Sequence, residues 1–196
     1  MEIFTGWHSW QRAEPELRSL LPARTCDAVA KAVQFATRWH GDQRRPTGAP
    51  YTEHLLEALE ILVRGARVSD PDVLSAAVLH DVVEDTPATI DDVRAAFGDQ
   101  VAELVGWVTI PEPAAGEDKA TAKDSYLKGL SSAPDDAIVV KLADRASNVQ
   151  TLRNLPLARQ RAYYAQTVAY IMPLAATRTW WAAWYTAWQQ AHRDLA

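Results

Sequence analysis

The 196-residue sequence predicts an all-α fold, and residues 1–196 are expected to form one domain. Apolar residues recur at helical spacing, and no segment shows a sustained strand-like alternation. A chain of this length buries one core well, whereas a second full domain would be cramped. Helices are expected over 25–40, 51–64, 71–85, 90–97, 99–108, 119–131, 135–153 and 157–190, the last broken near Pro173.

The helix expected over 51–64 places one histidine on an apolar face. His54 shares that face with Tyr51, Leu55, Ala58, Ile61 and Leu62. A single histidine among apolar residues is usually a hydrogen-bonded core residue. From this segment alone, a core histidine is therefore favoured over a ligand.

The helix expected over 71–85 is the most informative segment. Its residues from Val73 to Val83 are almost all apolar, as expected of a helix buried on every side. It ends at Thr86-Pro87 with a cluster of ionisable residues: His80, Asp81, Glu84 and Asp85. Burying unpaired carboxylates is unfavourable, so a divalent metal would stabilise this cluster. The alternative is a solvent-facing helix end with four hydrated side chains.

Two further helices have recognisable sequence features. Thr89 followed by Asp92 is typical of a helix N-terminus. In the helix over 135–153, one stripe is apolar, and the stripe beside it carries Lys141, Asp144, Asn148 and Thr151. This mixture of an anion, a cation and neutral hydrogen-bonding groups suits a ligand-binding wall, although a solvated helix face is equally compatible.

The C-terminal helix, about 174–192, contains half of the chain's tryptophans: Trp180, Trp181, Trp184 and Trp188. Three of them follow at intervals of four residues and so share a face. Such a face normally packs, either on the domain itself or on a second subunit in a homodimer. The helix lacks the basic face of a membrane-surface helix.

Taken together, three helices supply a candidate metal site: His54, His80, Asp81 and Asp144. Imidazole and carboxylate ligands suit Mn²⁺, Fe²⁺, Co²⁺ or Zn²⁺ rather than metals that prefer thiolates. Four protein ligands leave room for water and a substrate oxygen, as metal-assisted hydrolysis requires.

Three segments resemble a known family. They are H-G-D-Q-R-R-P-T-G-A-P-Y-T-E-H at 40–54, L-H-D-V-V-E-D-T at 79–86 and K-L-A-D-R-A-S-N-V-Q-T-L at 141–152. Their residues and order resemble the HD-domain phosphohydrolases, specifically the hydrolase domain of RelA/SpoT enzymes and the free-standing small alarmone hydrolases. The resemblance covers about residues 25–175. It implies a helical bundle around a single metal site.

The resemblance also implies roles. His54, His80, Asp81 and Asp144 would bind one metal, Mn²⁺ being usual in the family, and Glu84 with Asp85 would activate the attacking water. The substrate would be the small nucleotide (p)ppGpp, and the group removed from it would be the 3′-pyrophosphate. The residues expected to contact it are Arg44, Arg45, Asn148, Thr151 and Lys123. For Lys123, which follows the loop at 110–118, an ordinary surface position is equally compatible.

Three departures from the family pattern, Pro46, Ser147 and Gln150, fall in segments expected to line the nucleotide. They leave the base and the phosphate pattern open. An adenine alarmone or NADPH is therefore an alternative substrate, and a nucleotide-sensing domain with little turnover is an alternative function. The Glu84–Asp85 pair argues against a sensor, because binding alone does not require water activation.

Charge, cysteine count and the absence of targeting segments further limit the kinds of protein that this sequence can encode. The net charge of −5 gives no support for nucleic-acid binding, so an anionic substrate requires local cations, the candidates being Arg38, Arg44, Arg45, Lys119, Lys123, Lys141 and Arg145. Cys26 is the only cysteine, which excludes an intrachain disulfide. No secretory signal or membrane-spanning run is apparent, so a cytoplasmic protein is expected. The long RelA/SpoT enzymes that the chain resembles carry a synthetase domain after the hydrolase domain. A chain of this length is too short for both, so hydrolase activity alone is expected.

Overall fold

The computed structural model describes residues 1–45 and 47–196, and every regular element in them is helical. The all-α prediction is confirmed, while Pro46 lies outside the described residues. The helices are α1 (Trp10–Leu20), α2 (Ala23–His40), α3 (Tyr51–Glu60), α4 (Pro71–Leu79), α5 (Val82–Asp85), α6 (Ile90–Phe97), α7 (Asp99–Val108), α8 (Lys119–Gly129), α9 (Asp135–Gln150), α10 (Leu157–Gln166), α11 (Met172–Ala175) and α12 (Thr179–Ala191). Short π-helical turns extend α3 over Ile61–Gly65 and α10 over Thr167–Ile171.

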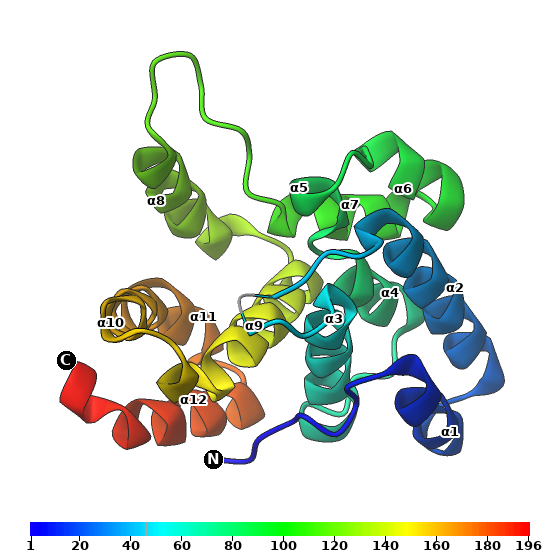
Figure 1. Ribbon diagram of the computed structural model, residues 1–196, viewed down its shortest axis with the longest axis horizontal. Helices are drawn as coiled ribbons and strands as arrows, with labels where there is room; N and C mark the ends of the chain where they lie inside the picture. The colour runs from blue at the N-terminus through cyan, green and yellow to red at the C-terminus, as the bar shows by residue number, and fades with distance from the viewer. Residues whose placement is uncertain (46) are drawn as a thin grey trace.

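Helix α4 lies in the middle of the bundle, packed against α2, α3, α7 and α9 (Figure 1). Every residue from Val73 to Leu79 is buried, which explains why the sequence is apolar on all sides. The Asp70 side chain caps the helix by accepting hydrogen bonds from the backbone N–H groups of Asp72 and Val73. A capped and fully buried helix fixes the position of the residues that follow its C-terminus.

Helices α3 and α9 pack against each other and against α4. These three helices, or the turns that follow them, carry the four predicted metal ligands. In contrast, the segment 110–118 and α8 project away from the bundle (Figure 1). The expected cap of α6 is present: the Thr89 hydroxyl accepts from the Asp92 N–H, and the Asp92 carboxylate accepts from the Thr89 N–H.

The structure divides two of the expected helices and adds one that was not expected. The span 71–85 is interrupted by a turn at His80 and Asp81, so its four ionisable residues do not lie on one continuous helix. The span 157–190 includes the π-helical turn over Thr167–Ile171 and is broken once, at the turn 176–178, a few residues beyond Pro173 where a break was expected. Helix α1 was not predicted. It contains Pro15, which favours helix ends in a sequence, and buries little besides Ala13 and Leu17.

The tryptophans of α12 pack inside the chain itself. Trp181, Trp184 and Trp188 are buried, whereas Trp180 is half-buried. The Trp188 Nε1–H donates to the Val149 carbonyl at 3.0 Å, and the Trp184 Nε1–H donates to the Glu2 carbonyl at 2.9 Å. The expected packing role is confirmed, and pairing of two chains through this helix stays a prediction. No helix in the described residues is long and apolar enough to span a lipid bilayer.

We expect Trp188→Ala to lower the free energy of unfolding by about 3–5 kcal/mol, because it leaves a large cavity beneath α9. The variant also leaves the Val149 carbonyl without its indole partner. Urea unfolding followed by circular dichroism measures the change. Trp107→Ala is the matched control, since Trp107 is 37% exposed. A stable Trp188→Ala protein with a selective loss of substrate affinity would instead place α12 in the active site.

Candidate metal centre

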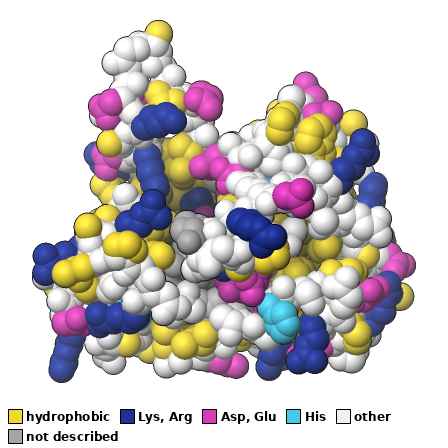
Figure 2. All heavy atoms as spheres, in the orientation of Figure 1, with side chains coloured by type: hydrophobic (Ala, Val, Ile, Leu, Met, Phe, Trp, Pro, Cys, Tyr) yellow, Lys and Arg dark blue, Asp and Glu magenta, His cyan; other side chains and the backbone are white. Residues whose placement is uncertain are grey.

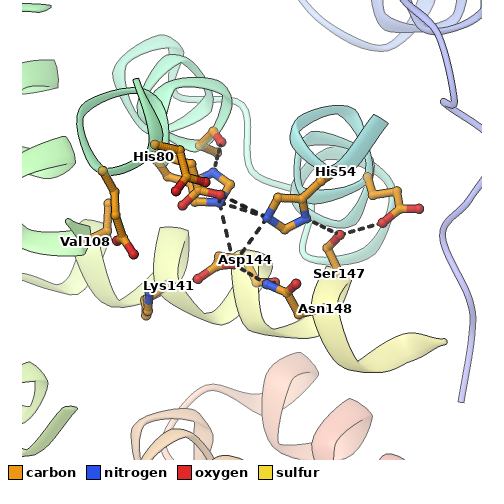
Figure 3. Close-up of polar contacts among 12 residues, drawn as sticks. His54, His80, Val108, Lys141, Asp144, Ser147 and Asn148 are labelled. Carbon is orange, nitrogen blue, oxygen red and sulfur yellow. Dashed lines mark hydrogen bonds and ion pairs between the residues drawn. The ribbon is translucent and has the colours of Figure 1, made fainter. Parts of the chain in front are cut away.

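The four predicted ligands converge, although they come from three parts of the chain. His54 lies on α3, His80 and Asp81 form the turn between α4 and α5, and Asp144 lies on α9 (Figure 3). The Nε2 atoms of His54 and His80 are 3.1 Å apart. Asp81 Oδ2 lies 3.4 Å from the His54 Nε2 and 3.0 Å from the His80 Nε2. Asp144 Oδ1 lies 3.4 Å and 3.5 Å from the same two nitrogens.

These separations fit a single bound cation. Neighbouring atoms that each bind one ion at roughly 2.1 Å sit about 3.0–3.4 Å apart. His54, His80 and Asp81 also form a compact group in which one ligand atom of each residue lies within 4.8 Å of the others. The donor set of two imidazoles and two carboxylates suits a divalent transition metal.

The hydrogen bonds of the two histidines show which ring nitrogens are free. His80 Nδ1 lies 2.8 Å from the Ala77 carbonyl, which can only accept, so this nitrogen carries the proton. The Ser147 hydroxyl donates to Glu57 Oε2 at 2.6 Å and therefore accepts from His54 Nδ1 at 2.8 Å. Both Nε2 atoms then present lone pairs to the same point. Two facing lone pairs repel each other unless a cation lies between them, so the residues fit a metal.

The electrostatics of the cluster also favour a cation. Burial alone would lower the pKa of each histidine, but the carboxylates of Asp81 and Asp144 outweigh it and raise the pKa of both. Burial alone would raise the pKa of Asp81 and Asp144, but neighbouring charges, His80 beside Asp81 and Lys141 beside Asp144, lower both. The cluster thus stabilises added positive charge, which a divalent ion supplies in place of protons.

We expect Ser147→Ala to weaken binding of a divalent metal by roughly 10–100-fold, the usual effect of removing a residue that orients a ligand. The substitution removes the hydroxyl that fixes the His54 ring, while Glu57 keeps its 3.0 Å ion pair with Arg45. Titration of Mn²⁺ against a competing chelator measures the affinity. Ser75→Ala, a buried serine of α4, should bind metal normally; equal affinities in all three proteins would contradict the assigned bond.

Glu84 and Asp85 lie one turn beyond the ligands, on α5. Glu84 Oε2 accepts the Ile110 backbone N–H at 3.1 Å, which fixes its carboxylate at the edge of the cleft. Partial loss of hydration raises the pKa of Glu84 above its usual range, against the opposing effect of that hydrogen bond. Such a carboxylate is a better proton acceptor than one in bulk water.

Tyr51 joins the ligands to this acidic pair. Its hydroxyl lies 2.5 Å from Asp81 Oδ2 and 2.5 Å from Asp85 Oδ2. Burial, and then the charge of Asp81, raise the pKa of Tyr51, so the phenol keeps its proton and donates it to a carboxylate. Sequence reasoning placed Tyr51 on the face of His54 but gave it no role. The contact joins residues 30 positions apart, which helix periodicity does not predict.

Three connected cavities surround these residues. A cleft of about 170 Å³, here called the metal cleft, is lined by Tyr51, His54, Asp81, Glu84, Asp85, Ile110, Lys123, Leu127, Lys141, Asp144, Arg145, Asn148 and Tyr163. A cavity of about 110 Å³, the side pocket, is lined by Arg45, Thr47, Asn148, Thr151, Asn154, Leu155, Arg159 and Tyr163. Asn148 and Tyr163 border both, so the two are continuous. An outer hollow of about 320 Å³ lies between α5 and the projecting part of the chain formed by the segment 110–118 and α8.

The walls of the outer hollow differ in charge. Glu84 and Asp85 line it on the α5 side, and Lys119 and Lys123 line it on the α8 side. Figure 2 shows acidic side chains facing basic ones across this hollow. An anionic ligand that enters here therefore passes between α8 lysines and the acidic pair.

Comparison with known proteins identifies the family. A model of the HD domain matches residues 32–181, about three quarters of the chain. The chain belongs to the HD-domain family. The fold brings its four predicted ligands, His54, His80, Asp81 and Asp144, together from α3, the turn after α4, and α9.

Relatives of this HD domain have related names. A Streptomyces coelicolor protein named GTP pyrophosphokinase is 37% identical over 152 residues, covering 77% of this chain and 18% of that protein. The Escherichia coli bifunctional (p)ppGpp synthase/hydrolase SpoT is 35% identical over 162 residues, covering 81% of this chain and 23% of that protein. The chain thus spans about a fifth of the length of these relatives.

A solved structure resembles this chain over almost the whole length of the solved protein. It belongs to a metazoan orthologue of SpoT described as hydrolysing ppGpp. The two structures share a TM-score of 0.76 and 29% sequence identity, covering 86% of this chain and 97% of the other.

Of the five residues predicted to contact the substrate, four line a cavity and one does not. Lys123 lines the metal cleft, and Arg45 and Thr151 line the side pocket, with Asn148 between the two cavities. Arg44 is exposed, donates to the Gly48 carbonyl at 2.9 Å, and is not among the residues lining either cavity. Its contact with substrate stays a prediction without structural support.

Two of the residues that depart from the family pattern, Ser147 and Gln150, do not lie beside the nucleotide site as expected. Ser147 is fully buried and orients His54, so it does not face a nucleotide. Gln150 is also buried, and its side-chain amide bonds to both the N–H and the carbonyl of Phe4. Ser147 therefore orients the predicted ligand His54, and Gln150 holds the N-terminal segment in place. They carry no information about the base that the site accepts.

Proposed function

We propose that this chain is a metal-dependent phosphohydrolase that removes the 3′-pyrophosphate of (p)ppGpp, giving GDP or GTP and pyrophosphate. One observation carries the proposal: four ligand side chains, oriented for one divalent cation, lie one turn from a fixed pair of carboxylates in a cleft continuous with a second pocket. The names of the relatives and the described activity of the similar structure support the substrate.

The metal would be held by His54, His80, Asp81 and Asp144, and we propose Mn²⁺. When bound, it supplies Lewis acidity and lowers the pKa of water in the cleft. Asn148 fixes Asp144 by donating to its Oδ1 at 2.6 Å, and Lys141 pairs with its Oδ2 at 2.8 Å. These bonds leave Asp144 little freedom, so the ligand set is already positioned before a cation binds.

The acidic pair would prepare the water. Glu84, held by Ile110, accepts a proton from the water, and Asp85, held by Tyr51, orients it. The water oxygen forms a bond to the phosphorus next to the ribose. The bond from that phosphorus to the ribose 3′-oxygen breaks, and the ribose oxygen takes up a proton. One water is consumed for each pyrophosphate released.

The charge of the metal cleft supports an anionic substrate. Four carboxylates and three cations line it, a net charge of −1: Asp81, Glu84, Asp85, Asp144, Lys123, Lys141 and Arg145. A divalent ion changes this net charge to +1. The loaded cleft therefore attracts phosphate, although the whole chain has a net charge of −5.

The side pocket would hold the nucleoside or its 5′-phosphates. Arg45 is fixed there by a 3.0 Å ion pair with the buried Glu57. Arg159 supplies a second cation, while Tyr163 supplies an aromatic ring. Asn148 and Thr151 supply polar groups at the boundary and the wall. This combination suits a phosphorylated nucleoside with a planar base.

A nucleotide panel tests the proposal. Protein loaded with Mn²⁺ is incubated with ppGpp, pppGpp, the adenine counterpart of ppGpp and NADPH, and the products are resolved by anion-exchange chromatography. We expect GDP and GTP from the two guanine nucleotides and no turnover after chelation. Turnover of only NADPH or the adenine nucleotide would change the substrate. Tight binding of ppGpp without turnover would favour a sensor.

A further inference from the structure

Glu57 is a buried carboxylate outside the ligand set. It is 6% exposed and lies on α3, three residues after the ligand His54, so the two side chains share one side of the helix. Its Oε2 atom accepts two hydrogen bonds. The Ser147 hydroxyl donates to it at 2.6 Å from α9, and the Arg45 guanidinium donates to it through Nη1 at 3.0 Å from the loop before α3.

These bonds form a continuous chain from the side pocket to the metal site. Ser147 lies beside the His54 ring (Figure 3), and its oxygen accepts from the His54 Nδ1–H at 2.8 Å. Because the proton of the Ser147 hydroxyl goes to Glu57, the donors at this end all point the same way, from the imidazole to the carboxylate. At the other end of the chain, Arg45 lines the side pocket.

The direction of these bonds determines how one end of the chain affects the other. A carboxylate that accepts from the second ring nitrogen of a ligating histidine makes the coordinating nitrogen a stronger ligand. Glu57 acts on His54 in this way through the Ser147 hydroxyl, but the positive charge of Arg45 offsets part of its negative charge. Hydrogen bonds in a chain polarise one another, so the strength of the ion pair affects how well the His54 Nε2 binds a cation.

An anion in the side pocket would change this balance. A nucleotide phosphate that accepts hydrogen bonds from Arg45 shares the guanidinium charge with Glu57. Glu57 then keeps more of its negative charge, attracts the Ser147 proton more strongly, and makes the His54 Nε2 a better ligand. The converse follows from thermodynamic reciprocity, since a cation bound at His54 must strengthen binding of the anion at Arg45 by the same factor.

We propose that Glu57 is a positioning residue that couples the two sites, so that an anionic nucleotide at Arg45 tightens binding of the divalent metal at His54. The inference rests on the proposed function, because it assumes a phosphorylated nucleoside in the side pocket and a metal at the four ligands. It adds a regulation of that site: the metal is held most tightly while a nucleotide is bound. The connection passes through Ser147, a residue in which this chain departs from the family pattern.

The affinity for Mn²⁺ with and without GDP tests the coupling. GDP carries 5′-phosphates and no 3′-phosphate, and a chelator buffer fixes the concentration of free Mn²⁺, because GDP itself also binds the ion. Saturating GDP should tighten Mn²⁺ binding by the unchanged protein by roughly 5–20-fold, at the lower end of typical couplings between sites. In Glu57→Gln and Ser147→Ala, which interrupt the chain at different points, the factor should fall below about twofold.

Glu60→Gln is the matched control for the loss of a buried carboxylate. Glu60 also lies on α3 and is buried, but it pairs with Arg64 at 2.7 Å and takes no part in the chain of bonds. This variant should keep the full effect of GDP. Ser147→Ala leaves the ion pair between Arg45 and Glu57 in place, so it tests the coupling even if Glu57→Gln does not fold.

Arg45→Gln gives a result that a purely structural role would not produce. Without the guanidinium, the charge of Glu57 acts on Ser147 and His54 alone. In the absence of GDP, this variant should therefore bind Mn²⁺ at least as tightly as the unchanged protein, and GDP should add less than about twofold. Weaker Mn²⁺ binding by folded Arg45→Gln protein would contradict the proposed direction of the coupling.

Two further results would overturn the role of Glu57. One is an unchanged affinity for Mn²⁺ when GDP saturates the unchanged protein. The other is an equal effect of GDP in Ser147→Ala, which would leave direct attraction between the nucleotide and the ion. Both would leave the proposed function intact, because the nucleotide panel measures hydrolysis separately. Absence of turnover in that panel would instead overturn the proposed function, while the effect of GDP on Mn²⁺ binding could still be measured.

Discussion

Replacing Asp81 by alanine is expected to abolish both metal binding and turnover. Asp81 Oδ2 faces both histidine nitrogens at 3.0–3.4 Å and also accepts from Tyr51, so its loss removes a ligand and disturbs the acidic pair. We expect the affinity for Mn²⁺ to fall by roughly 10²-fold or more, beyond the usual effect of losing an orienting residue. Elemental analysis after dialysis and a phosphate-release assay measure the two losses.

Asp91→Ala provides the matched control, because Asp91 is an exposed aspartate on α6. It should retain the metal content and the activity of the unchanged protein. His80→Ala should behave like Asp81→Ala. Stoichiometric metal and full activity in purified His80→Ala protein would show that the metal binds elsewhere.

Glu84→Gln and Asp85→Asn are expected to separate catalysis from metal binding. Each change keeps the shape of the side chain but removes a proton-accepting carboxylate that is not a metal ligand in this assignment. We expect the catalytic constant to fall by roughly 10²–10⁴-fold, the usual contribution of general acid–base catalysis. The metal content should stay near that of the unchanged protein.

Glu103→Gln, an exposed glutamate of α7, controls for the loss of a negative charge. The experiment compares metal content and catalytic constant in all four proteins. Unchanged rates in both Glu84→Gln and Asp85→Asn would leave activation of water to the metal alone. The pair would then be only the end of a helix.

The fold follows from local features of the sequence, whereas the predicted ligand set follows from three separated segments taken together. The uniform apolar character of Val73–Val83 predicts a buried helix, and α4 is buried from Val73 to its end at Leu79. The residue types at positions 54, 80, 81 and 144 predict a metal site, and the structure brings the two imidazole Nε2 atoms to 3.1 Å from each other and each carboxylate to within 3.0–3.5 Å of both. The buried helix is encoded by neighbouring residues, and helix geometry is enough to interpret it. The ligand set instead joins three separated segments, and it was predicted from their residue types together with the family resemblance.

The supporting contacts of the site were not predictable in this way. Ser147 bonds to His54 across 93 positions, and Gln150 bonds to Phe4 across 146 positions. Both were expected beside the nucleotide because they follow Asp144 on the same helix. Helix periodicity gives the face on which a residue lies, but it does not give the element that packs against that face.

Hydrolysis of ppGpp in ¹⁸O-labelled water tests the central claim most directly. The account places an activated water beside the phosphorus next to the ribose, so Mn²⁺-loaded protein should form unlabelled GDP and pyrophosphate carrying one ¹⁸O. Mass spectrometry of both products gives the result in a single reaction. Label in the GDP, or no cleavage of ppGpp with Mn²⁺ present, would contradict the account.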